Sequence, residues 1–337
     1  MSSSISSSET DPGWGRSLKA CLGALVGAAL LVLALMVLVD PYDSGKLGLL
    51  GIDGVDNRLT QITAASRARN PDFNAAILGN STAQMIEPAE LSRATGLHFV
   101  QLHMTGSIPR QQLAVLHFFL RHHKQVGALV IVADPGWCEH ARPKEEGGVP
   151  FPDWLYDRSV VTYAVRLISW QAIEQAFQRL SIGLGRRQRM NPDGYFSYED
   201  IWPPGQFREI NWPRDPPPAA SAEIRTRFPE IDALADIVKG LPADAPVVIV
   251  VPPTFAATVP KPSTETALER SACDAALKQV VAGRPRSNFI SYRVDNDLTR
   301  DRANFADFIH YRPKLARRIE QGIAASLRDG ESARIDF

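Results

Sequence analysis

Ser81 has the sequence setting of a nucleophilic side chain. It follows a short apolar run at residues 75–78 and the turn-forming pair Gly79-Asn80, and helix-forming residues come next. This order predicts a strand, a turn and a helix start, which puts Ser81 where backbone N–H groups are unpaired. Such N–H groups suit the oxyanion that forms when a serine attacks a carbonyl. A serine that only caps the helix would occupy the same position.

A second group with chemical potential lies near the C-terminus, in the sequence Asp307-Phe308-Ile309-His310. This spacing lets the carboxylate turn back onto the imidazole and fix its tautomer. The other ring nitrogen is then free to take a proton from a serine. An isolated Asp-x-x-His pair has little specificity. Here both residues follow the last predicted strand, so we expect them at the same sheet edge as Ser81.

Between these two segments, short apolar runs alternate with longer amphipathic stretches. Five such units predict an α/β fold, with a five-stranded mostly parallel sheet and helices on both faces. Residues 247–251 have the continuous β-branched sequence expected of a central strand. The predicted strands are residues 75–78, 97–102, 128–133, 247–251 and 287–292, and the predicted helices include 82–95, 110–123, 159–182, 264–282 and 313–327.

These motifs resemble those of the SGNH (GDSL-like) hydrolase superfamily. Gly79-Asn80-Ser81 resembles its first block, and the segment that ends at His310 resembles its last block. The chain looks most similar to the membrane-anchored, extracytoplasmic branch associated with polysaccharide O-acetylation and de-acetylation. The resemblance implies a strand order of 2-1-3-4-5 and leaves residues 138–245 unmatched. It also implies site roles: Ser81 as nucleophile, His310 as general base, Asp307 as its orienting carboxylate and Gly106 as an oxyanion donor.

The sequence departs from this family at Asp134. The family's third block offers an asparagine side chain to the oxyanion, whereas this chain has Asp134-Pro135-Gly136-Trp137 after the third strand. An ionised carboxylate would repel an oxyanion, and the loss of one donor typically costs about 10²–10³-fold in rate. Three readings stay open: two backbone donors suffice, the insertion supplies another donor, or the chemistry is weak or altered. We assign Asn80, Asp134 and Trp137 to substrate binding.

The N-terminal region predicts a membrane anchor. Residues 20–39 contain no charge, and at helical rise twenty residues span roughly 30 Å, the thickness of a bilayer core. Arg16 and Lys19 precede this segment and Asp40 follows it, which favours a cytoplasmic N-terminus and an extracytoplasmic domain. We expect a disordered tail at 1–17, an anchor at 18–40, a connector at 41–70 and an α/β domain at 71–330, with the insertion at about 138–245.

The insertion is rich in aromatic residues. They could stack on sugar rings, or they could simply pack the insertion against the sheet. Those in residues 191–218 are Tyr195, Phe196, Tyr198, Trp202, Phe207 and Trp212.

Charge and cysteine content narrow the possible partners. The chain has 37 basic and 37 acidic residues and no basic block, so nucleic-acid binding has no electrostatic support. It has no CxxC and no Cys/His cluster with metal-ligand spacing, so we expect neither a metal nor a cofactor. Cys21 lies in the apolar segment, which leaves Cys138 and Cys273 as the one possible disulfide, paired or not.

Together these features favour a membrane-anchored serine esterase or O-acyltransferase. Its expected substrate is an acylated carbohydrate or a small ester outside the cytoplasmic membrane, in the setting of a polysaccharide-modification machinery. A non-catalytic subunit of the same fold, which binds carbohydrate or assists assembly, is the alternative. A lipid-directed lipase or thioesterase would need an apolar site, which the polar and aromatic insertion disfavours.

Overall fold

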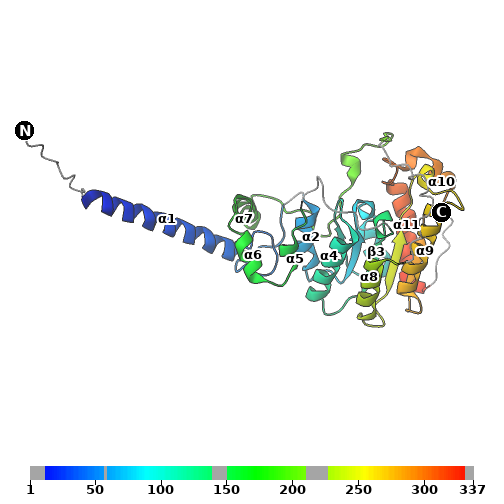
Figure 1. Cartoon of the computed structure of the whole chain (residues 1–337), viewed down its shortest axis with the longest axis horizontal. Helices are drawn as coiled ribbons and strands as arrows, with labels where there is room; N and C mark the ends of the chain where they lie inside the picture. The colour runs from blue at the N-terminus through cyan, green and yellow to red at the C-terminus, as the bar shows by residue number, and fades with distance from the viewer. Residues whose placement is uncertain (1–11, 57–58, 139–149, 210–226, 331–337) are drawn as a thin grey trace, which may run out of the picture.

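The structure is a computed structural model that describes residues 12–56, 59–138, 150–209 and 227–330. A long helix, α1 (Pro12–Val39), projects from an α/β domain, as Figure 1 shows. The helix begins at Pro12, ahead of the predicted start at residue 18. Residues 1–11 of the predicted tail and Trp212 lie outside the described residues.

The centre of the domain is a parallel sheet of five strands in the order β2-β1-β3-β4-β5. This confirms the predicted fold class and strand order. Each strand lies within two residues of its predicted bounds, because each contains a short group of apolar residues. The strands are β1 (Ala75–Gly79), β2 (Phe99–His103), β3 (Ala128–Val132), β4 (Val247–Val251) and β5 (Asn288–Ser291).

Both faces of the sheet are covered by helices. Alternate strand residues such as Leu78 and Ile131 pack into one core cluster, together with α2 (Thr60–Ala68), α4 (Pro109–His122), α8 (Pro229–Lys239) and α9 (Glu265–Val281). The intervening residues, such as Val248 and Val250, pack on the opposite face against α3 (Pro88–Thr95) and α11 (Pro313–Asp329). Both valines are fully buried, as a central strand requires.

Two predicted helices differ from the observed ones. The predicted helix at 82–95 is a 3-10 turn at Ser81–Ala83 followed by α3, which begins at Pro88. Proline suits the first turn of a helix because its missing N–H would have no partner there. The predicted helix at 159–182 is divided into α6 (Val160–Arg166) and α7 (Trp170–Gly183). Ser169 makes the division because its side chain accepts the N–H of Ala172 and caps α7.

The long insertion is partly helical and packs onto the sheet. It contains α5 (Asp153–Tyr156), α6 and α7, and α8 leads into β4. Tyr198 is buried, and Trp202 and Phe207 are partly buried against the second core cluster. A short helix, α10 (Asp297–Arg300), follows β5.

Helix α1 is long and apolar enough to cross a membrane. Within Trp14–Val39 an 18-residue window has a mean hydropathy of 2.9 and is only 11% buried. Within the described ranges no other helix is long and apolar enough to cross a membrane. Its last turn belongs to the domain, since Met36 and Val39 are buried in the first core cluster.

Candidate functional site

The end of β1 fixes the position of Ser81. A side chain at Gly79 would come within 2.8 Å of the Ala83 Cβ and 3.0 Å of the Val132 Cβ, so only glycine allows this close turn. Asn80 then caps the 3-10 turn, because its Oδ1 accepts hydrogen bonds from both the N–H and the hydroxyl of Thr82 (2.9 Å each). Ser81 is the first residue of this turn and is half-buried.

Asp307 and His310 lie in a tight loop just before α11. The loop closes through an antiparallel bridge between Phe305 and Tyr311. Within it, Oδ1 of Asp307 accepts the backbone N–H groups of Ile309 and His310, both at 2.9 Å. The carboxylate thus turns back onto its own loop, as the spacing predicts, and its oxygens lie 2.8–2.9 Å from Nδ1 of His310.

The structure brings Ser81, His310 and Asp307 into one hydrogen-bonded chain. Nε2 of His310 lies 2.8 Å from Oγ of Ser81, across 229 residues of sequence. Since the carboxylate can only accept, these contacts assign the ring proton to Nδ1 and leave Nε2 to accept from the serine hydroxyl. This is the arrangement of a serine nucleophile, its general base and an orienting carboxylate.

The surroundings of Asp307 keep it ionised. Burial alone would raise the pKa of Asp307, but the hydrogen bond and positive charge of His310 and the two backbone N–H groups outweigh burial and lower that pKa below its usual value. The carboxylate is only 5% exposed, so it faces the imidazole rather than water. It can therefore stabilise the imidazolium that forms when His310 takes a proton.

Two backbone N–H groups are available near the serine. Gly106 follows β2 in a turn with φ of +70°, a conformation that glycine adopts without strain. Gly79 is paired with His103 in the sheet, so the turns that hold Ser81 and Gly106 leave neighbouring strand ends. In the part of the chain that the structure describes, the N–H groups of Ser81 and Gly106 donate to no other group. They fit the donor roles that the resemblance implies for them.

The three residues assigned to substrate binding, Asn80, Asp134 and Trp137, form hydrogen bonds with other groups of the protein. Asn80 caps the serine turn as described above. Oδ1 of Asp134 accepts the N–H of Gly136 at 2.8 Å, and its Oδ2 accepts from Nε2 of Gln112 at 3.3 Å. Trp137 is 2% exposed, and its indole N–H donates to Oε1 of Gln112. Asp134 and Trp137 therefore hold the loop after β3 in shape, and neither the buried carboxylate nor the buried ring offers much surface to a ligand.

Aromatic rings from the insertion flank His310, which sequence reasoning did not foresee. The rings of Tyr198 and Trp202 lie 5.8 and 5.5 Å from the imidazole. Tyr198 donates its hydroxyl hydrogen bond to the carbonyl of Tyr311. The only sign of this contact in the sequence is the high aromatic content of the insertion. No local pattern predicts which loop packs against a site more than a hundred residues away in sequence.

A buried arginine holds this aromatic segment against the histidine loop. Arg312 donates hydrogen bonds to the carbonyl of Phe305 on one side and to Trp202 and Glu199 on the other. It also donates to the carbonyls of Pro203 and Gln206. The insertion segment and the His310 loop are thus joined by one side chain.

His103 is a second histidine close to the site, and it is unsuited to proton transfer. It is fully buried at the end of β2, and neither ring nitrogen has a hydrogen-bond partner among the described residues. Burial, with a further contribution from the positive charge of Arg67, lowers the pKa of His103 to about 3. It stays neutral at physiological pH and does not compete with His310 as a base.

Cys138 and Cys273 form a disulfide with a Cα–Cα distance of 5.5 Å. This resolves the pairing that the sequence left open. The bond joins the loop that Asp134 begins to α9 and closes 135 residues of chain.

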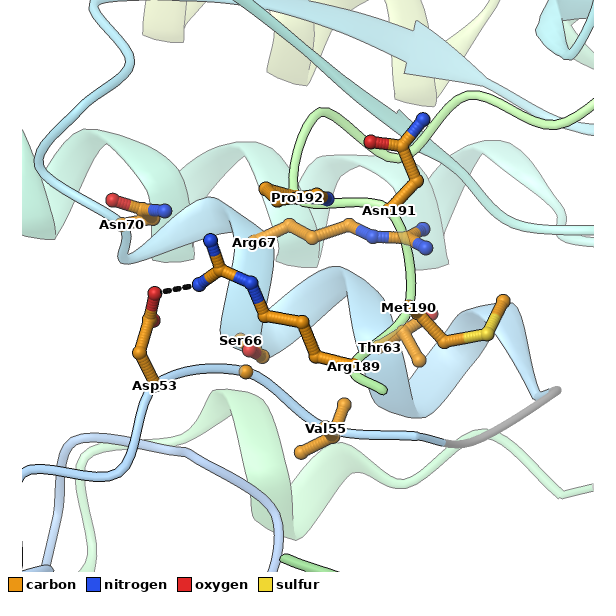
Figure 2. A pocket seen from close by; sticks show the side chains of 11 residues that line it. Asp53, Val55, Thr63, Ser66, Arg67, Asn70, Arg189, Met190, Asn191 and Pro192 are labelled. Carbon is orange, nitrogen blue, oxygen red and sulfur yellow. Dashed lines mark hydrogen bonds and ion pairs between the residues drawn. The ribbon is translucent and has the colours of Figure 1, made fainter. Parts of the chain in front are cut away.

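A small cavity lies elsewhere, between α2 and the segment 189–192 (Figure 2). The side chains of Arg67 and Arg189 point into this cavity, and Arg189 forms an ion pair with Asp53. None of the predicted site residues lines it. Its free volume of about 20 Å³ has room for roughly one or two water molecules. Among the described residues, no group of three or more His, Cys, Asp or Glu could hold a metal ion.

No protein-family model, curated protein or solved structure matches this chain.

Proposed function

We propose that this protein is a membrane-anchored serine esterase or O-acyltransferase of the SGNH type that acts on acylated carbohydrates or small esters. The observation that carries the proposal is the hydrogen-bonded chain from Ser81 through His310 to Asp307. A capping serine alone would need neither partner, and a structural histidine would not need to face a serine hydroxyl at 2.8 Å.

In the proposed mechanism, Oγ of Ser81 attacks the ester carbonyl while Nε2 of His310 takes the hydroxyl proton. The N–H groups of Ser81 and Gly106 stabilise the oxyanion, and Asp307 stabilises the imidazolium. The C–O bond to the leaving alcohol breaks, and His310 returns the proton to that alcohol. Water then completes a hydrolysis, or a sugar hydroxyl completes a transfer, with His310 as its base.

The proposed location is the outer face of the cytoplasmic membrane, with residues 1–11 in the cytoplasm. The apolar helix α1 supports an anchor, and the charges of Arg16 and Lys19 before it support the orientation. The Cys138–Cys273 disulfide is independent support, because disulfides persist mainly in oxidising compartments outside the cytoplasm.

One observation favours a second candidate, a non-catalytic subunit that binds carbohydrate or assists assembly. Asp134 stands where the resembling family has an asparagine donor, and its carboxylate is occupied by Gly136 and Gln112. An enzyme of this design would depend on two backbone donors alone.

Turnover of p-nitrophenyl acetate by the detergent-solubilised chain tests the proposal. We expect Ser81→Ala to lower turnover by about 10³-fold or more, since the nucleophile is lost. The matched control is Ser271→Ala, which removes an exposed serine hydroxyl on α9 that bonds only its own helix, and it should retain full activity. Equal activity of Ser81→Ala and the wild-type protein would refute catalysis by Ser81. Acetate release from an O-acetylated oligosaccharide, with and without an acceptor sugar, then separates hydrolysis from transfer.

A further inference from the structure

A set of large apolar side chains is exposed around the point where α1 enters the domain. Ile168 is 83% exposed, and Leu49 and Trp170 are each 77% exposed. Single exposed apolar residues are common, but several large ones on neighbouring segments at one end of a domain suggest an interaction surface. The set, which we call the collar, comprises Leu49, Leu50, Val160, Val161, Val165, Ile168, Trp170, Phe177 and Leu184.

The collar residues follow helical spacing. Val161, Val165 and Ile168 recur at intervals of four and three residues along α6 and its C-terminal end. On α7, Trp170 and Phe177 lie two turns apart and are exposed, whereas Ile173 between them packs partly against the first core cluster. The face of α7 that packs on the protein carries Ala172, Ala176 and Arg179 instead. Helix α7 therefore has one face for the domain, and it carries two large apolar side chains, Trp170 and Phe177, that are exposed on the side away from it.

Side-chain hydrogen bonds fix α7 to the end of α1. Arg179 is buried and donates to the carbonyls of Val39 and Asp40, and it forms an ion pair with Asp43. Helix α6 is fixed in the same way, because the Tyr163 hydroxyl donates to the Asp40 carboxylate.

The loop that carries Leu49 and Leu50 is held there too. The N–H groups of both leucines donate to the carbonyl of Leu38, in the last turn of α1. The collar thus cannot move far from the point where α1 leaves its apolar stretch.

The orientation of α7 relative to α1 fits contact with a flat membrane surface. In Figure 1, α1 runs across the page while α7 is seen end-on beside the domain end of α1. A helix that crosses a membrane-spanning helix in this way lies along the membrane plane. Exposed arginines accompany the apolar residues, namely Arg158, Arg166 and Arg186. Tryptophan and arginine next to an apolar helical face are typical of helices at a lipid headgroup layer.

We propose that the collar is an interfacial membrane-binding surface, seated in the headgroup layer of the same bilayer that α1 crosses. Its partner is a phospholipid surface, with arginines placed to meet phosphate groups and apolar side chains placed at the acyl boundary. The proposal rests on the membrane anchor proposed above. It adds that the α/β domain is held against the membrane with a fixed side toward it, rather than tethered freely.

The test uses the full chain in vesicles of phosphatidylcholine and phosphatidylglycerol. Cys21→Ser removes the free cysteine and leaves the disulfide intact. A fluorophore is attached through one new cysteine at a time: Phe177→Cys on the collar, Gln171→Cys on an exposed polar position of the same helix, and Leu30→Cys within α1. Lipids carrying a nitroxide near the headgroup or deep in the acyl chain then quench the label.

The label at position 177 should lose roughly half of its fluorescence to the shallow quencher and less to the deep one, since interfacial helices bury about 5–10 Å. The label at 171 should change little, and the label at 30 should respond to the deep quencher. If the label at position 30 is quenched but the label at 177 is quenched no more than the label at 171, the collar proposal is refuted and the membrane anchor is retained. If the label at 177 is protected from a water-soluble quencher but is quenched by neither nitroxide lipid, a protein covers this surface, and the membrane-binding proposal is refuted. No quenching at any position would refute the anchor and the collar together.

Discussion

Replacement of Arg312 by methionine should weaken both the fold and the site. Arg312 has a side chain 5% exposed and donates five hydrogen bonds, four to carbonyls and one to the Glu199 carboxylate. Methionine keeps most of the volume and removes every donor, so the four carbonyls and the carboxylate lose this partner. Glu199 is 25% exposed and can regain water, so the loss comes mainly from the four carbonyls. At about 1 kcal/mol for each lost hydrogen bond, the unfolding free energy should fall by about 3–5 kcal/mol.

The loss should appear as a fall in Tm of roughly 6–10 °C, because each kcal/mol shifts the Tm of a large domain by about 2 °C or more. Turnover below the new Tm should also fall, by roughly 10–10²-fold, since the Trp202 segment no longer holds the loop of His310 in place. Thermal unfolding and p-nitrophenyl acetate turnover of the same preparation measure both effects.

The matched control is Arg302→Met, which removes an exposed arginine that packs over Phe207 in the same region. It should change Tm by about 1 °C at most, as exposed ion pairs contribute little. A Tm for Arg312→Met equal to that of Arg302→Met would refute the argument that the buried hydrogen bonds hold the insertion on the site.

Three further predictions concern the triad, the sheet and the disulfide. Asp307→Asn should leave Tm within a few degrees but lower turnover by about 10⁴-fold, because an amide no longer selects the productive tautomer of His310; unchanged turnover would contradict the orienting role. Val250→Ala should cost roughly 1–3 kcal/mol in chemical denaturation, from lost burial plus a cavity in the central strand; a wild-type midpoint would contradict its central position. Reduction of the Cys138–Cys273 bond should cost about 2–5 kcal/mol, since it closes a long loop in the unfolded chain; an identical Tm with and without reductant would contradict this.

The strands were predictable because their signal is local. Val247–Val251 is β-branched throughout, and the observed β4 has the predicted bounds. The alternation of strands and helices was enough to indicate a parallel sheet. Helix boundaries depended on single residues whose effect is ambiguous in sequence. Pro88 ends one helical pattern and begins another helix, and Ser169 interrupts a pattern that reads as continuous.

The residue types of the candidate site and its local Asp307–His310 contact could be predicted from the sequence, but the contacts that the insertion makes around the site could not. The Asp307–His310 spacing indicates the carboxylate–imidazole contact, because three residues suffice for the chain to turn back. The meeting of His310 with Ser81 follows only from the sheet topology, which brings distant strand ends to one edge. The contact of Trp202 with the His310 ring and the hydrogen bond from Arg312 to the Trp202 carbonyl are tertiary contacts. No local sequence pattern predicts where the insertion that carries Trp202 packs. The sequence predicts a substrate contact for Asp134, and in the structure its carboxylate accepts hydrogen bonds from Gly136 and Gln112.

The most direct measurement of the central claim is covalent labelling of the folded protein by a serine-directed fluorophosphonate probe, with the labelled peptide identified by mass spectrometry. We predict one adduct, on Ser81, formed at a rate that falls by about 10³-fold or more in His310→Ala, because the serine loses its base. Gln112→Ala, which alters the loop after β3 without touching the triad, should label at a rate close to that of the wild-type protein. Absence of an adduct on Ser81, or equal labelling rates with and without His310, would contradict the assignment of Ser81 as an activated nucleophile.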